Sequence, residues 1–424
     1  MPTDTRPIFF PAIAHSLSQF YNESDSSWIK HSPNITKSVR FFNKTKNPYF
    51  YHPYLLFNGF EHYKIKDIRK KKKIDKHCLM FADSGGFQLG NGQSLNGNYN
   101  KQIALEWSEN NGDIFPILDQ PLWNEYKTKF DDALKFTIES AEYYSKHRNP
   151  KLKNTILNVL QGNDIEEVEE WYHKIKHIKL DGWAIGGCAF NPTLYLSAIR
   201  MLYKHGEFKK KKNWMHIFGT SSFENMLYVS VIQKNMNKLC NIQLSYDSAT
   251  LSHTTKFGKF FESKPNLSGF VRGSNDKDMK DVGTLPVMYS DLCESIDKFR
   301  YIFLSKRFNY KFVKKDTKLP LPYSPVINEI TDAREFCKNK ETYFMVGNLH
   351  NLWMMIQQKE LFDNLVFWND ERVINKSIGN ELKLNINVIN EMFTKKELKK
   401  KYDMKNKNLL DAFNNHTTHY SNRV

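Results

Sequence analysis

Short apolar runs alternate with longer amphipathic stretches over the first two-thirds of the chain, and this alternation limits the folds open to it. The apolar runs are Ile8–Ile13, Tyr54–Phe57, Cys78–Ala82, Ile114–Leu118, Thr155–Leu160, Gly182–Ile185, Met215–Phe218 and Ile242–Tyr246. The segments between them that look helical include Phe130–Lys146, Asp164–Ile178, Pro192–Tyr203 and Ser222–Met236. Short, nearly continuous apolar runs are typical of buried parallel strands, and their alternation with helices indicates βα units. About eight such runs favour a closed (β/α)8 barrel over an open sheet.

Polar or glycine residues come directly after six of these runs. They are Asp83, Asp119, Gln161, Gly186–Gly187, Gly219 and Asp247. The C-terminal ends of the strands of a (β/α)8 barrel converge on one face, which carries the chemistry in enzymes of this fold. The sequence therefore predicts that these residues form one pocket.

A length of 424 residues allows one such barrel with insertions. We expect residues 1–260 to form most of the barrel, residues 261–345 to form an insertion, and residues 346–424 to supply helices that pack on the barrel. Within the last segment, His350–Gln358 and Asn385–Lys401 look helical.

The chain carries a strong positive charge, with 62 Lys and Arg residues against 46 acidic ones and a formal net charge of +16. Such an excess favours polyanionic partners, although a Lys-rich composition encoded by an AT-rich genome gives the same balance. The sequence has no run of 18 apolar residues, and its first residues do not resemble a secretory signal. Five scattered cysteines are typical of free thiols in a reducing cytoplasm. We therefore expect a cytoplasmic protein with no membrane segment.

The segment Asp83-Ser84-Gly85-Gly86-Phe87-Gln88 combines several chemical groups behind one strand. Asp83 offers an acid or base, Ser84 a hydrogen-bonding group, and Phe87 a stacking face. Paired glycines allow a tight turn or the close approach of backbone to a ligand. The competing interpretation is an ordinary βα turn in which Asp83 caps the next helix.

The remaining strand-end residues suit a flat purine. Asp119 and Gln161 can together read the Watson–Crick edge of guanine, although each alone could be a satisfied structural group. Gly186 and Gly187 would let backbone groups reach a flat ligand. Phe218, beside Gly219, could clamp a base against Phe87, with core packing as the alternative.

Asp247 completes the set, in the segment IQLSYDSATLSHTTKFG. A carboxylate placed to attack an anomeric carbon can form a covalent glycosyl–enzyme intermediate. Asp83 would then manage the protons.

These motifs, in this order, resemble the queuine/archaeosine tRNA-guanine transglycosylase family. RPIFFPAI resembles the family's first strand, FADSGGFQ its most diagnostic motif, and LQG, AIGG and IFG match at the expected places. SYDSATLSHTTKFG aligns without a gap, from Asp247 to Gly258, on the nucleophile segment FDCVxPTRxxRxG. VGNLHNLW resembles the start of the C-terminal helix that supplies a zinc-binding His. The resemblance covers residues 7 to about 360.

The resemblance implies a (β/α)8 fold and a role for each matched residue. Asp247 would be the nucleophile and Asp83 the general acid/base. The base would be read by Ser84, Asp119, Gln161 and Gly187 and sandwiched by Phe87 and Phe218. The exchange of one N-glycosidic bond for another implies no cofactor.

Three departures from the family pattern change the expected partner. The arginines that grip the tRNA anticodon loop fall on His253 and Lys256, and Lys does not replace the bidentate grip of Arg. The CxCPxC zinc segment survives only as 322–327, without thiolates, so we expect no structural zinc there. Pro192 stands where the bacterial family has a Glu that supports an aminomethyl base, which favours a cyano-type 7-deazaguanine.

A family member without these arginines and this zinc module resembles the phage and bacterial DNA-guanine transglycosylases, and a phage-encoded enzyme would act in the host cytoplasm. We therefore expect a pentosyltransferase that inserts a 7-deazaguanine into DNA. A tRNA transglycosylase with a rebuilt RNA-binding surface and a non-catalytic binding subunit are the alternatives. The sequence leaves open the oligomeric state, the target sequence, and whether Cys293, Cys337 and His350 form a substitute metal site.

Overall fold

The computed structural model describes ten segments of the chain. They are residues 5–13, 40–45, 50–90, 99–122, 129–187, 191–209, 213–220, 222–249, 340–368 and 380–399. The expected insertion, residues 261–345, lies outside the described residues except for 340–345.

Eight parallel strands form a nearly closed barrel, as the alternation of apolar runs predicts. They are β1 (Ile8–Pro11), β2 (Tyr54–Asn58), β3 (Leu79–Asp83), β4 (Ile114–Pro116), β5 (Thr155–Leu160), β6 (Gly182–Ile185), β7 (Asn213–Ile217) and β8 (Ile242–Ser248). Each strand pairs with the next along the chain from β2 to β8, and β8 pairs with β1. The remaining seam, between β1 and β2, is held by one bridge between Ala12 and Leu56 and by the Ile13 N–H, which donates to the Leu56 carbonyl at 2.9 Å.

Both faces of the strands are buried, which explains why the strands appear in the sequence as continuous apolar runs. Inside the barrel, Phe10 of β1 lies 5.5 Å from Phe81 of β3 and 6.2 Å from His216 of β7, measured between ring centroids. On the outer side, Phe9 stacks on Tyr246 at 5.4 Å. Alternate residues of a strand therefore fill the barrel interior and the layer under the helices.

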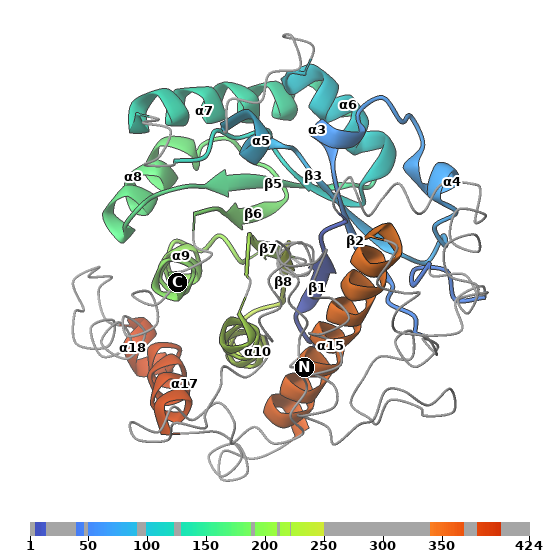
Figure 1. The fold of residues 1–424 in the computed structure, drawn as a ribbon. Coiled ribbons are helices and arrows are strands. Elements are labelled where there is room, and N and C mark those ends of the chain that lie inside the picture. Colours follow the sequence, from blue (N-terminus) through green and yellow to red (C-terminus); the bar gives the residue numbers. More distant parts are fainter. Residues whose placement is uncertain are drawn as a thin grey trace, which may run out of the picture.

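Helices surround the strands, and Figure 1 shows α6 to α10 and α15 around the barrel. The helices are α3 (Gly59–His62), α4 (Ile68–Lys72), α5 (Gly86–Gly90), α6 (Lys101–Asn111), α7 (Phe130–His147), α8 (Ile165–Ile175), α9 (Pro192–Lys204), α10 (Phe223–Asn237), α15 (Lys340–Trp368), α17 (Asn380–Met392) and α18 (Lys395–Lys399). Side-chain caps mark several of their starts. Asp164 accepts from the Glu167 N–H at 2.8 Å, and Asn191 accepts from the Thr193 N–H at 3.1 Å, ahead of Pro192.

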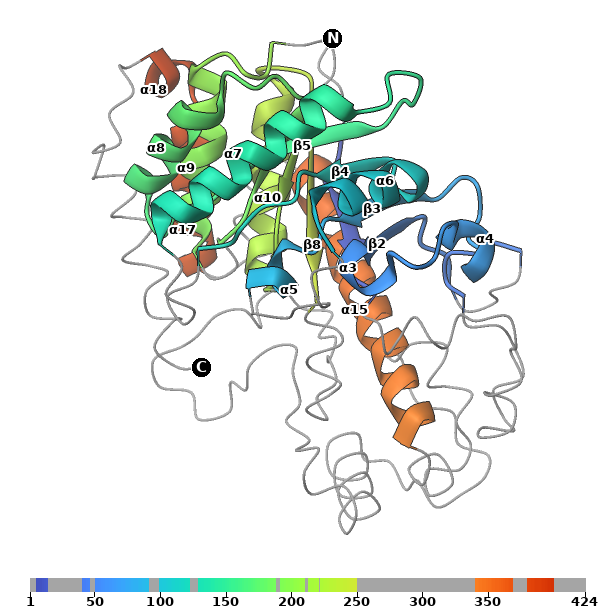
Figure 2. The same cartoon turned by 90° about the horizontal axis from the view of Figure 1, so that it is seen from above.

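The C-terminal helices pack on the barrel, but their extents differ from those expected. The helix expected at His350–Gln358 is part of the much longer α15, which runs past the edge of the barrel in Figure 2 and spans the expected domain division at residue 346. The segment Asn385–Lys401, expected to be helical, is helical over most of its described part, where it is divided between α17 and α18. The Thr394 hydroxyl accepts from the Glu397 N–H at 3.2 Å and so caps a new helix start.

Buried polar contacts fix α15 against α10. The Ser230 hydroxyl donates to Asp363 at 2.7 Å, and Lys359 forms an ion pair with the same carboxylate at 2.5 Å. The Asp363 side chain is 2% exposed. None of the helices in the described segments is long and apolar enough to cross a membrane.

Replacing Asp363 by Ala is expected to lower the free energy of unfolding by about 3 kcal/mol, because it leaves the part-buried Lys359 ammonium without its counter-charge and Ser230 without its buried acceptor. Ser230→Ala, which removes one neutral donor, is expected to cost only about 1 kcal/mol. Urea unfolding of the two variants measures both values, and equal effects would contradict the assigned role of the ion pair.

Candidate active site

The polar strand-end residues lie at one end of the barrel, as the fold requires. Asp83 is the last residue of β3 and Asp247 the sixth of the seven in β8, while Asp119 and Gln161 follow β4 and β5 closely. The negative charges of Asp247 and Asp119 both raise the pKa of Asp83. The structure thus brings together three carboxylates from three strands.

Asp83 is held by a neighbouring strand. The amide nitrogen of Asn58, paired with Asp83 in the β2–β3 register, donates to Asp83 Oδ2 at 2.5 Å and to Gln88 Oε1 at 2.9 Å. The Gly85 N–H also donates to the Asp83 carboxylate, so Asp83 shapes the turn as well. Burial, and then the charges of Asp247 and Asp119, raise the pKa of Asp83 to about 7. A carboxyl group with this pKa can give and take protons near neutral pH.

Asp119 and Gln161 form a buried pair. The Gln161 amide donates to Asp119 Oδ2 at 2.6 Å, and burial raises the pKa of Asp119 to about 6 despite this bond. Two further polar atoms at this end of the barrel, Gln161 Oε1 and Ser84 Oγ, are buried and have no hydrogen-bond partner among the described residues. An unsatisfied buried polar atom costs about 1–3 kcal/mol, so these atoms are suited to meet a ligand.

Glycines let this pair pack closely. A Cβ atom at Gly86 would lie 2.5 Å from the Asp119 carbonyl oxygen, and one at Gly186 would overlap the Gln161 amide. The sequence suggested that the Gly186–Gly187 backbone approaches a ligand. In the structure, Gly186 also makes room for Gln161, and Gly187 follows with φ of +71°.

The Asp247 carboxylate is fixed by two donors on one oxygen. Asp247 Oδ1 lies 2.8 Å from the Gly219 nitrogen, which donates to it, and 3.3 Å from His216 Nε2. Gly219 has φ of +68°, a left-handed conformation that other residues rarely adopt, and it turns this N–H toward Asp247. Among the described residues, Oδ2 has no hydrogen-bond partner.

His216 belongs to a hydrogen-bond chain that runs through the barrel interior: Trp214, Ser245, His216 and Asp247. The Trp214 indole can only donate, and it does so to Ser245 Oγ at 2.7 Å. The Ser245 hydroxyl lies 2.9 Å from His216 Nδ1 and donates to it when the ring proton is on Nε2, the nitrogen that faces the Asp247 carboxylate. Burial lowers the pKa of His216, so the ring is neutral. Its remaining proton is then on Nε2 and points at Asp247 Oδ1.

Ser245, His216 and Asp247 carry the residue types of a hydrolase triad, but their arrangement does not suit one. Ser245 and His216 are both 0% exposed. The hydroxyl already accepts from Trp214 and lies deeper in the barrel than the ring. A substrate cannot reach this serine, whereas the Asp247 carboxylate lies near the C-terminal end of β8, on the face that carries the chemistry in this fold.

Of the two rings of the predicted aromatic clamp, Phe218 has ring contacts that fix its position, and Phe87 is exposed. Phe218 is half-buried, 4.6 Å from the His216 ring and 5.9 Å from that of Phe81, both edge-on. Phe87 has a side chain 46% exposed. These positions suit one fixed ring and one accessible ring, and the sandwich itself stays a prediction.

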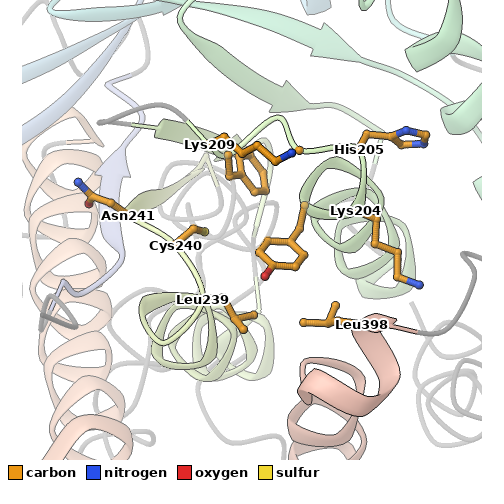
Figure 3. A pocket seen from close by; sticks show the side chains of 10 residues that line it. Lys204, His205, Lys209, Leu239, Cys240, Asn241 and Leu398 are labelled. Carbon is orange, nitrogen blue, oxygen red and sulfur yellow. The ribbon is translucent and has the colours of Figure 1, made fainter.

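Other predicted residues lie elsewhere. His253, Lys256, Cys293, Cys337 and segment 322–327 are outside the described residues. His350 is 1% exposed within α15. A pocket of about 680 Å³ is lined by the end of α9 and the residues after it, by Leu239–Asn241 between α10 and β8, and by Leu398 of α18. It contains no predicted site residue (Figure 3).

Sequence reasoning missed Asn58 and the chain of Trp214, Ser245 and His216. Asn58 directly follows an apolar run, so the rule that selected Asp83 would have found it. His216 lies inside a run, two residues before Phe218, where strand alternation places both side chains on the same face. Nothing in the sequence pairs it with Ser245.

The chain matches no protein-family model and no curated protein. The assignment of a function therefore depends on the residues and their geometry.

Replacing Asp83 by Asn tests its environment without any substrate. Folding raises the Asp83 pKa from 3.8 to about 7, so the carboxyl group favours the folded state least at high pH. The loss of folding stability caused by ionised Asp83 is absent below about pH 4, grows up to about pH 7, and is constant above that. Asp83→Asn is therefore expected to raise the melting temperature by a few degrees at about pH 8 and to leave it unchanged at about pH 4. The same gain at both values would contradict the raised pKa.

Proposed function

We propose that the protein is a DNA-guanine transglycosylase, which exchanges guanine for a 7-deazaguanine through a covalent bond between Asp247 and the sugar. One observation carries this proposal: the Asp247 carboxylate is held through one oxygen, and the electrostatically coupled Asp83 has a pKa near neutrality. A displacement of a nucleobase at C1′ needs this pair, a fixed nucleophile and a group that exchanges protons.

The first half-reaction breaks the bond between guanine and the sugar. The target nucleotide leaves the base stack, which costs a few kcal/mol. Asp247 Oδ2 attacks C1′ and forms a C–O bond, while the C1′–N9 bond breaks and its electron pair leaves with the base. The protonated Asp83 transfers its proton to the departing guanine.

The second half-reaction reverses these steps with a new base. The deazaguanine gives its N9 proton to the Asp83 carboxylate, and its N9 attacks C1′. The C–O bond breaks and Asp247 is regenerated. Asp83 must act as an acid and then as a base, so its pKa of about 7 suits both halves.

The buried polar atoms beside Asp119 suit a guanine-like edge. Guanine presents N1–H and N2–H2 donors and an O6 acceptor. Asp119, ionised above its pKa of about 6, and Gln161 Oε1 would accept from the two donors, while the Ser84 hydroxyl would donate. Both 7-deazaguanine and guanine share this edge, as an exchange reaction requires. Pro192 favours the 7-cyano base.

The choice of DNA as the polymer depends on charge and on the departures from the tRNA enzymes. A net charge of +16 favours a polyanion of either kind. The loss of arginine at positions 253 and 256 favours DNA. A tRNA enzyme is the alternative.

A non-catalytic subunit is disfavoured by the carboxylates. Burial and mutual repulsion raise the pKa of Asp83, and such an arrangement costs folding stability. A subunit that only binds a partner has no need of carboxylates that lower its folding stability in this way.

The substrate test offers purified protein duplex DNA or tRNA, with radiolabelled guanine or 7-cyano-7-deazaguanine. Label is expected in DNA, and Asp247→Asn is expected to abolish it because an amide is a poor nucleophile. Labelling of tRNA alone would contradict the choice of polymer. Undiminished labelling by Asp247→Asn would contradict the nucleophile.

Replacing His216 by Phe tests the positioning of Asp247. The ring volume is retained while the Nε2–H donor is lost, so Asp247 is held less firmly. We expect kcat for exchange to fall about 10-fold to 100-fold, with little change in KM for the incoming base. Tyr143→Phe, which removes a hydroxyl from a residue of α7 that contacts neither Asp83 nor Asp247 in the described hydrogen bonds, is the control. A fall in stability with unchanged kcat would show that His216 is only structural.

A further inference from the structure

Three metal-ligating side chains meet at the opposite end of the barrel from Asp83. Glu169 and His173 lie one turn apart on α8, and His205 is the C-cap residue of α9. Their ligand atoms all lie within 4.8 Å of one another. Helices of a βα barrel run antiparallel to the strands, so residues at their C-terminal ends lie near the N-terminal ends of the strands.

The local packing holds these side chains close together. The His205 ring lies 4.9 Å from the Tyr172 ring and 5.4 Å from the His173 ring, nearly perpendicular to the latter. The Tyr172 hydroxyl is itself fixed, because it donates to Glu207 at 2.9 Å. His173 Nε2 lies 3.8 Å from Glu169 Oε1 on the same helix. Small rotations of exposed side chains would bring all three ligand atoms to one ion.

The donor set points to a particular class of ion. Imidazole nitrogen suits Zn²⁺ and its neighbours in the first transition row, whereas Mg²⁺ and Ca²⁺ take oxygen ligands. Two His and one Glu leave a fourth tetrahedral position for water. We propose that Glu169, His173 and His205 bind a divalent transition-metal ion, with Zn²⁺ as the test ion, that joins α8 to the end of α9.

Lys176 supplies an internal competitor for this site. Its ammonium nitrogen lies 2.9 Å from His173 Nδ1 and donates to it. An ion bound by either nitrogen of His173 displaces this contact. An ion at Nδ1 takes the lone pair that accepts from Lys176. An ion at Nε2 leaves the ring proton on Nδ1, which can then no longer accept from Lys176. The positive charge of Lys176 also repels the ion. Removal of Lys176 is therefore expected to tighten metal binding.

The site is separate from the proposed transglycosylase chemistry and from segment 322–327, where the sequence predicts no zinc. Glu169 and His173 are outside the pocket of Figure 3, and His205 stands at its edge with the ring directed away from Leu239 and Leu398. An ion here would stabilise the contact of two helices, so its loss leaves the exchange reaction unaffected.

Calorimetric titration of the metal-stripped full chain with Zn²⁺ tests the proposal, because it measures stoichiometry directly. His205→Gln and His173→Gln are each expected to bind one Zn²⁺ fewer than the unmodified chain, and Lys176→Met to bind it more tightly. His147→Gln, which alters an exposed histidine at the end of α7, is the matched control and should bind as the unmodified chain does. Mg²⁺ should not compete.

Melting curves provide a second readout. Zn²⁺ is expected to raise the melting temperature of the unmodified chain more than that of His205→Gln. Equal Zn²⁺ stoichiometry in the unmodified chain and both His variants would overturn the site, as would displacement of Zn²⁺ by Mg²⁺.

Discussion

The hydrogen-bond chain from Trp214 to Asp247 is the interaction on which the rest of the site depends. It joins β7 to β8 inside the barrel, where register pairs His216 with Ser245, and it ends on one oxygen of the carboxylate. Because the indole can only donate and the carboxylate can only accept, the hydrogen bonds of a neutral His216 all run from Trp214 toward Asp247. A buried polar network of this kind is stable only when each polar group has a hydrogen-bond partner. In this network the partners of His216 direct its Nε2–H toward Asp247. The barrel thus orients a carboxylate without using a charged partner.

The same end of the barrel contains several buried carboxylates, which lower the stability of the folded protein. Burial raises the pKa of both Asp83 and Asp119, and Asp247 and Asp119 raise that of Asp83 further. Asn58, Gln161 and backbone N–H groups offset part of this cost with hydrogen bonds. Within the described part of the chain, the buried atoms Ser84 Oγ and Gln161 Oε1 have no hydrogen-bond partner. Uncompensated polar groups beside tuned carboxylates are typical of sites that meet a ligand.

Much of the fold follows from the sequence, because parallel strands buried on both faces appear as apolar runs; β5 and β6 have the predicted bounds. Polar strand ends such as Asp83 and Gln161 could be found in the same way. Pairings across strands could not, since the contact of His216 with Ser245 depends on register. The division between α17 and α18 was missed because a single capping residue, Thr394, interrupts a continuous helical pattern. The need for glycine at 186 likewise depends on the packing of Gln161.

Mass spectrometry of a trapped intermediate tests the central claim most directly. Protein incubated with duplex DNA, without an incoming base, and quenched in acid denaturant should retain a covalent adduct. The adducted peptide is expected to contain Asp247, linked through its side chain to the sugar. Addition of 7-cyano-7-deazaguanine before the quench should discharge the adduct. An adduct on another residue, or base exchange that proceeds with no adduct, would contradict the assignment of Asp247 as the nucleophile.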